Sequence, residues 1–206
     1  KAIRRFHSLT RSGVKLGDIR ADACAEVYKS AAMSVLTYAL ALCPPESNRV
    51  TQLNAAQALF ANKFLGLPKG TPGCIALSEL GFTDMQLVAA RARVLLLCRV
   101  MNNQEDDLTR ALVSWPLDSA GSTFLTQSED ALLILGFSGP LENLIKAPYK
   151  HVAYCLKQLV NTAQQERWER VAGRLRGGSY ILSKVNWGFE AALVECPPDQ
   201  AMSFIK

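Results

Sequence analysis

The stretch MQLVAARARVLLLCRVM, residues 85–101, decides the fold class because it is apolar on most of its sides. A helix of this composition is buried nearly all round, and we expect it at the centre of a packed domain. Asp84 directly precedes the stretch and is a favourable N-cap residue. The sequence therefore predicts a central helix against which the rest of the chain packs.

Helical spacing of apolar residues continues on both sides of this stretch, and no convincing run alternates with a period of two. Proline and glycine interrupt the pattern where helices should end. We expect further helices at residues 2–12, 23–43, 48–65, 72–80, 108–114, 128–135, 140–145 and 149–176, and a last one after Pro197 and Pro198. The prediction is an all-α protein, an irregular bundle of about nine helices.

A change in composition predicts the domain organisation. Residues 115–123 contain Pro, Asp, Gly and Ser and form the best candidate for a linker. We expect two packed lobes, a basic N-terminal one at residues 1–114 and a C-terminal one at residues 124–206. Residues 31–43, the longest apolar stretch, are too short for a membrane span, which needs about 20 apolar residues, so we expect no membrane partner.

Charge and cysteine usage limit the class of protein. The chain has 206 residues and a net charge of +5, and residues 1–103 hold 13 basic against 6 acidic residues. A basic half suits a polyanionic partner, although a solvated surface with no dedicated partner explains the charge equally well. The six cysteines are scattered without a Cys-x-x-Cys motif, which favours reduced thiols in an intracellular, reducing compartment, either nucleus and cytoplasm or an organelle matrix. Because the first residue is Lys, we expect that the natural N-terminus lies upstream.

Catalytic patterns are missing from the sequence. The two histidines, His7 and His151, have no metal-ligand spacing, so we expect no metal and no cofactor. A hydrolase with a Cys–His pair stays open as a minor alternative, although a surface histidine and buried thiols explain these residues better. The tripeptide at residues 69–71 has the order Lys-Gly-Thr after a predicted helix, which excludes a phosphate-binding loop, and helix capping by Thr71 explains it better.

Basic side chains repeat along two predicted helices. At 100° per residue, Arg167, Arg170 and Arg174 fall within about 60° of one another, a row that could follow a phosphate backbone. A solvated rim of an amphipathic helix is the alternative. Arg91 and Arg93 point about 200° apart on the central helix, where a packing role is the alternative. Our candidate nucleic-acid-binding residues are Arg4, Arg5, Arg11, Lys15, Lys69, Arg91, Arg93, Arg167, Arg170 and Arg174.

Two blocks of the sequence carry a family resemblance. Residues 65–72, LGLPKGTP, followed by Glu-Leu-Gly at 79–81 and then by Arg91 and Arg93, resemble a segment of non-LTR retrotransposon reverse transcriptases. The segment is the thumb and helical connector that follow the catalytic palm. Upstream, Tyr38-Ala39 stands where the family usually has Tyr-Gly. Downstream, Trp168, Leu175, Tyr180 and Lys184 are similar to its later pattern of aromatic, apolar and basic residues.

The resemblance implies a noncatalytic RNA-binding module. The family holds two metal ions with aspartates, one set in a Tyr/Phe-x-Asp-Asp turn that this chain lacks. We therefore expect either a piece of a longer polymerase or a domesticated remnant, which binds RNA or an RNA–DNA hybrid mainly through the backbone. Two alternatives stay open. One is a structural subunit of a large ribonucleoprotein such as an organellar ribosome, and the other is a helical protein–protein adaptor.

Overall fold

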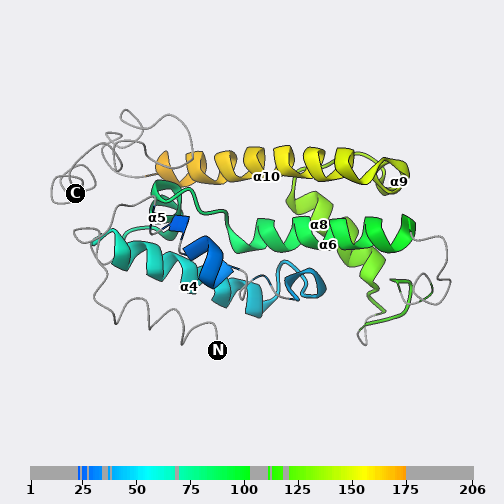
Figure 1. The fold of residues 1–206 in the computed structure, drawn as a ribbon, viewed down its shortest axis with the longest axis horizontal. Helices are drawn as coiled ribbons and strands as arrows, with labels where there is room; N and C mark the ends of the chain where they lie inside the picture. The colour runs from blue at the N-terminus through cyan, green and yellow to red at the C-terminus, as the bar shows by residue number, and fades with distance from the viewer. Residues whose placement is uncertain are drawn as a thin grey trace. The chain divides into compact units, whose positions relative to one another are not determined.

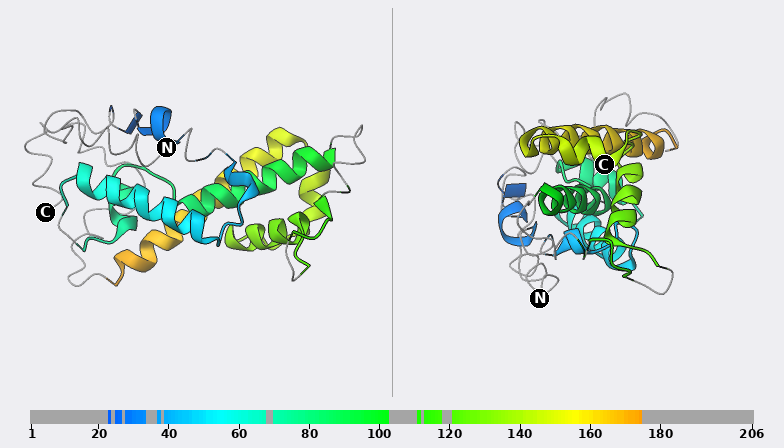
Figure 2. Two further views of the ribbon diagram at one scale, coloured as in Figure 1. Left: turned by 90° about the horizontal axis from the view of Figure 1, so that it is seen from below. Right: turned by 90° about the vertical axis from the view of Figure 1, so that its right-hand side faces the viewer.

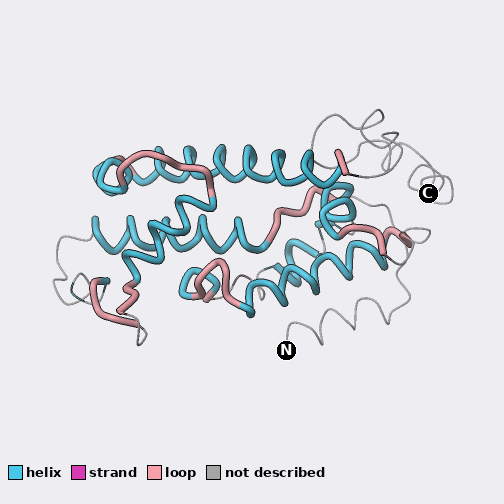
Figure 3. Tube along the Cα trace, turned by 180° about the vertical axis from the view of Figure 1, so that it is seen from behind, coloured by secondary structure: helices cyan, strands magenta, loops and turns pink. Residues whose placement is uncertain are grey.

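The computed structural model describes residues 39–67, 70–102, 113–117 and 121–174, together with 23, 25, 26, 28–33, 37 and 111. Of the interpretable residues, 73% are helical, and no strand is drawn among them (Figures 1 and 3). The all-α prediction is confirmed for this part of the chain. Its helices are η1 (Tyr28–Met33), η2 (Leu40–Leu42), α4 (Asn48–Phe64), α5 (Gly73–Glu79), α6 (Met85–Asn102), α8 (Phe124–Ile134), α9 (Leu141–Lys146) and α10 (Tyr149–Ala172).

Most helix bounds agree with the predictions, and the described residues hold fewer helices than the nine expected. Helices α4, α6 and α9 begin and end within two residues of the predicted positions. Helix α8 begins earlier than expected because Thr123 caps it, accepting a hydrogen bond from the Thr126 backbone. Helix α10 ends at Ala172 rather than at residue 176. The helices expected at residues 2–12 and after Pro198 lie outside the described residues.

The single helix predicted for residues 23–43 is wrong in the part that is described. The chain forms the π-helix η1 and later the short 3-10 helix η2. Between them Ala39 adopts a left-handed backbone with φ 57°, which no continuous α-helix permits. Leu42 is 62% exposed, whereas Tyr28 and Leu40 are buried. The break at Ala39 therefore changes which side chains face inward.

The chain divides into two compact units that are not the two consecutive lobes we expected. One unit comprises residues 1–38, 51–84 and 164–206, and the other residues 39–50 and 85–163. Residues 115–123 lie inside the second unit, where Pro116 pairs with Thr123 and the Leu117 N–H donates to the Ser122 carbonyl over 2.7 Å. The expected linker is thus closed at its base as a loop.

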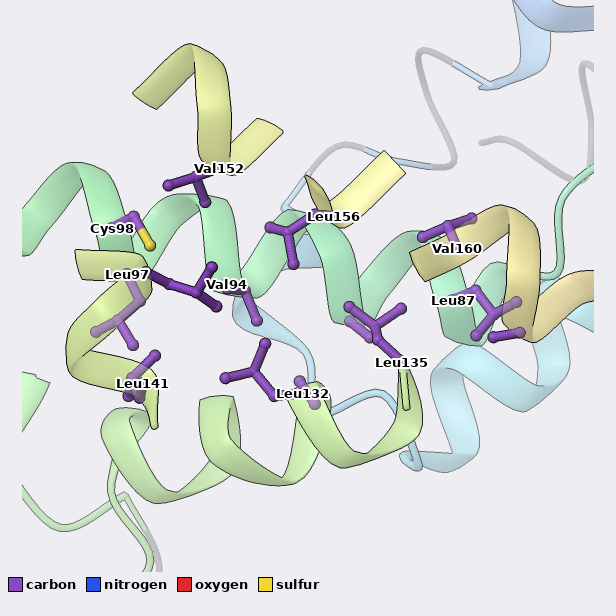
Figure 4. Close-up of a cluster of buried hydrophobic side chains, with 14 of the residues drawn as sticks. Leu87, Val94, Leu97, Cys98, Leu132, Leu135, Leu141, Val152, Leu156 and Val160 are labelled. Carbon is purple, nitrogen blue, oxygen red and sulfur yellow. The ribbon is translucent and has the colours of Figure 1, made fainter. Parts of the chain in front are cut away.

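The core of the second unit surrounds α6. Helix α8 and the first part of α10 both lie beside α6 (Figure 2). Val152, Leu156 and Val160 reach the core from α10, Leu132 reaches it from α8, and Leu135 reaches it from the position that caps the end of α8 (Figure 4). They meet the buried side chains of α6, which include Leu87, Val94, Leu97 and Cys98. The central position predicted for this helix is confirmed within this unit.

The core of the first unit is aromatic. The ring of Tyr28 stacks on Phe60 at 4.8 Å and on Phe82 at 4.4 Å between centroids. Helix α5 approaches α4 closely, because a Cβ atom on Gly73 would lie 2.7 Å from that of Ala58. Trp168, near the end of α10, is buried against Ile75. These contacts place the last turns of α10 in this unit.

Candidate nucleic-acid interface

Helix α10 separates a buried face from an exposed one because its apolar residues recur at steps of three and four. Within the second unit Val152, Leu156 and Val160 are buried, whereas Lys150 and Lys157 are exposed. No acidic residue occurs between Tyr149 and Gln165. The exposed face of this part of the helix is therefore cationic.

Arg167 belongs to a polar cluster within the first unit. Its guanidinium lies 3.3 Å from a carboxylate oxygen of Asp84, and the two side chains are 27% and 18% exposed. The same oxygen accepts a hydrogen bond from the Asn54 amide over 3.2 Å, and the Asp84 N–H donates to Gln164 over 3.0 Å. An arginine held by a carboxylate has part of its charge neutralised, so Arg167 is a weaker phosphate ligand than its position in the sequence suggested.

Arg170 and Arg174 are both exposed, and no carboxylate among the described residues forms an ion pair with either. Because α10 ends at Ala172, Arg174 lies in the turn that follows, where its N–H donates to the Val171 carbonyl over 3.0 Å. Only Arg167 and Arg170 of the predicted row therefore lie on the helix itself. The guanidiniums of Arg170 and Arg174 remain accessible to a phosphate.

Arg93 is fully buried in the second unit. Its guanidinium donates to the Ala41 carbonyl over 3.4 Å and to the side-chain oxygen of Gln127, and it lies 4.1 Å from the centroid of the Phe124 ring. Burial lowers the pKa of this guanidinium from its ordinary value. In this conformation Arg93 cannot reach a phosphate, so we remove it from the interface. The packing role predicted from the sequence as the alternative to RNA binding is the one Arg93 has, in keeping with its position on an apolar helix.

Arg91, on the same helix, is half-buried. Its Nε atom is buried and has no hydrogen-bond partner among the described residues. Burial of this atom leaves only part of the guanidinium accessible, and we give Arg91 no role in the interface. Arg4, Arg5, Arg11, Lys15 and Lys69 lie outside the described residues.

A second cationic group lies on α10, in the second unit, and was not predicted from the sequence. Lys150 and Lys157 are exposed, and between them Tyr154 is 63% exposed. The row predicted on α10 consists of arginines and does not include these lysines. The available signal was the run without acidic residues from Tyr149 to Gln165, with an aromatic residue at helical spacing from two lysines.

A further pair brings cysteine and histidine together. The Sγ atom of Cys155 lies 3.5 Å from Nε2 of His151, one helical turn away on α10. The backbone N–H groups around Cys155 are used within the helix, so they cannot form an oxyanion hole beside the thiol. The geometry does not favour a covalent hydrolase at this pair.

Neither a metal site nor a membrane span is found in the described part of the chain. The described residues contain no group of three or more His, Cys, Asp or Glu placed to hold a metal ion. No described helix combines the length and the apolar character that a membrane crossing needs. The described cysteines, Cys43, Cys74, Cys98 and Cys155, are free thiols.

Comparison with known proteins leaves the family open. No protein-family model matches the chain, and no significant match was found among curated proteins or among solved structures.

Proposed function

We propose that the chain is a noncatalytic RNA-binding helical module. The observation that carries the proposal is the exposed face of α10 in the second unit, where Lys150 and Lys157 lie on a helical segment without acidic residues. Phosphates supply most of the attraction in nucleic-acid binding, and they need exposed cations that no carboxylate already holds. Arg170 and Arg174 meet the same condition in the first unit.

The family resemblance supports the proposal independently of these contacts. The block at residues 65–72, with Glu-Leu-Gly at 79–81, resembles the thumb and connector of non-LTR retrotransposon reverse transcriptases. We therefore propose that the module derives from, or belongs to, such an enzyme.

A salt titration tests the RNA-binding proposal. Binding of a fluorescein-labelled single-stranded RNA, measured by anisotropy, should weaken steeply with salt, since each neutralised phosphate adds about −0.7 to the slope of log K against log salt. The double variant Arg170→Gln/Arg174→Gln should make the slope about 1.4 less steep. Its control is Arg49→Gln/Lys63→Gln, which removes the same charge from exposed positions on α4. A flat titration of the wild type would refute RNA binding.

Exposed apolar side chains favour a second candidate, a structural subunit of a ribonucleoprotein. Trp115 and Leu117 are 66% and 54% exposed, on either side of Pro116, which pairs with Thr123. Large exposed apolar groups often mark a protein partner. Size-exclusion chromatography of the endogenous protein distinguishes the two candidates. A stable subunit elutes with its assembly, and a free monomeric pool would contradict this role. A helical adaptor without RNA contact predicts no crosslinks from RNA to any basic residue of the chain.

A further inference from the structure

Lys150, Tyr154 and Lys157 form one surface on α10 within the second unit. At 100° per residue, Tyr154 lies about 40° to one side of Lys150 and Lys157 about 20° to the other. At 1.5 Å per residue, the two lysines are about 10 Å apart along the helix axis, with the tyrosine between them. The three side chains therefore share one narrow exposed face.

Tyr154 is unusual because it is a large aromatic side chain in solvent without a structural use. It is 63% exposed, and no hydrogen bond or ring contact joins it to another described residue. Tyr149, five residues earlier, shows the contrast. Its hydroxyl accepts a hydrogen bond from Arg99 over 2.6 Å, and the same guanidinium lies 4.7 Å from its ring centroid. Tyr149 thus serves the fold, whereas most of the Tyr154 side chain is exposed to solvent.

The two lysines determine the charge of that ligand. Both are exposed, and neither forms an ion pair with a described carboxylate. No acidic residue lies on the helix until Glu166, so nothing on this stretch of α10 repels an anion. An aromatic ring between two free ammonium groups matches a strand that alternates phosphates with unstacked bases.

We propose that this face binds single-stranded RNA, with a base stacked on Tyr154 and flanking phosphates held by Lys150 and Lys157. Bases in a duplex are stacked on one another and cannot cover the tyrosine, so the face discriminates single strands from duplexes. This inference rests on the proposed RNA-binding function and adds the class of RNA and the stacking residue. It is distinct from the phosphate contacts proposed for Arg170 and Arg174.

The test compares a labelled single-stranded RNA with a duplex of equal length by fluorescence anisotropy of the full chain. One stacked base is worth about 1–3 kcal/mol, so Tyr154→Ala should weaken single-strand binding by about 5- to 150-fold. Tyr154→Phe keeps the aromatic face and should stay within about twofold of the wild type. Duplex binding should be the same for all three proteins. Lys150→Gln/Lys157→Gln should make the single-strand salt slope about 1.4 less steep.

Controls separate stacking from a general loss of apolar surface. Leu133→Ala removes a side chain that is 71% exposed on α8 and should leave both affinities unchanged. Photocrosslinking of 4-thiouridine RNA provides a second measurement and should label the tryptic peptide that contains Tyr154. The substitutions at Tyr154 and Leu133 both lie on the surface, and circular dichroism checks that they leave the helix content unchanged.

The outcomes distinguish the inference from the function on which it rests. Wild-type binding that Tyr154→Ala does not weaken would overturn the inference and leave RNA binding intact. A wild type that binds neither RNA would overturn both. Binding of a poly-glutamate peptide that depends on Tyr154, without any effect on RNA, would assign the face to an acidic protein and also overturn the inference.

Discussion

Replacing Gln127 tests whether Arg93 is a structural cation. The Gln127 side chain accepts a hydrogen bond from the buried guanidinium and donates one to the Ser122 hydroxyl over 2.9 Å. A hydrogen bond to a charged group contributes about 1.5–3 kcal/mol, and Gln127 is half-buried, which places its share near the lower end. With the neutral bond to Ser122 added, we expect Gln127→Met to lower the free energy of unfolding by about 2–3 kcal/mol.

The same substitution should cost less when the charge is absent. In an Arg93→Met background, Gln127→Met loses only its bond to Ser122, about 1 kcal/mol. The loss of the Ser122 bond is common to both backgrounds and cancels in a double-mutant cycle. The coupling energy between Arg93 and Gln127 should therefore be about 1.5 kcal/mol. Because removing one partner of a buried charge is worse than removing both, the double variant should be more stable than the sum of the single effects predicts.

Urea unfolding followed by circular dichroism measures all four proteins, and equal m values show that the compared transitions expose equal surface. Costs that add within about 0.5 kcal/mol would refute the buried contact. Arg93→Met should also leave RNA affinity unchanged, because the guanidinium is inaccessible in the fold. A loss of RNA affinity at unchanged stability would return Arg93 to the interface.

Two further predictions concern the backbone and pH. Ala39 is exposed and has φ 57°, which costs an L-residue about 1–2 kcal/mol, so Ala39→Gly should raise the free energy of unfolding by about 0.5–1 kcal/mol in a urea titration, whereas a decrease would contradict the left-handed backbone. Burial raises the pKa of the Tyr28 hydroxyl, so the folded state keeps this proton after the unfolded chain has released it above about pH 10. Stability should then fall with rising pH by about 1.4 kcal/mol per unit for this group, and Tyr28→Phe should flatten the fall. Parallel pH profiles of the wild type and the variant would show that Tyr28 is not buried.

The helices that could be predicted are those whose apolar pattern and stop signals agree. Helix α6 is apolar on most sides and Asp84 precedes it, and the structure begins it at Met85 as expected. Prediction failed at residues 23–43, where the periodicity continues through Ala39 although its backbone is left-handed. Apolar spacing does not depend on φ at a single residue.

The two compact units could not be predicted because each joins segments that are distant in sequence. Composition along the chain favoured a boundary at residues 115–123, yet the division falls near Tyr38, Val50, Asp84 and Ala163. Long-range contacts determine such a division, and they include the hydrogen bond between Asp84 and Gln164. Neither residue lies in a stretch rich in proline or glycine, so local signals gave no warning.

Burial explains why the number of basic residues in a sequence overestimates the number that are available to bind a polyanion. A guanidinium on an apolar helix must find its partners inside the protein, since an unsatisfied buried charge is very costly. Arg93 therefore contacts Ala41, Phe124 and Gln127, and because it is fully buried its guanidinium cannot reach a ligand. Lys157, on an exposed face without acidic residues, makes no such contact. Only exposed and unpaired charges attract a polyanion. The lysines of α10 are therefore better candidates for RNA binding than Arg91 and Arg93 of α6. A count of cations along the sequence does not distinguish the two groups.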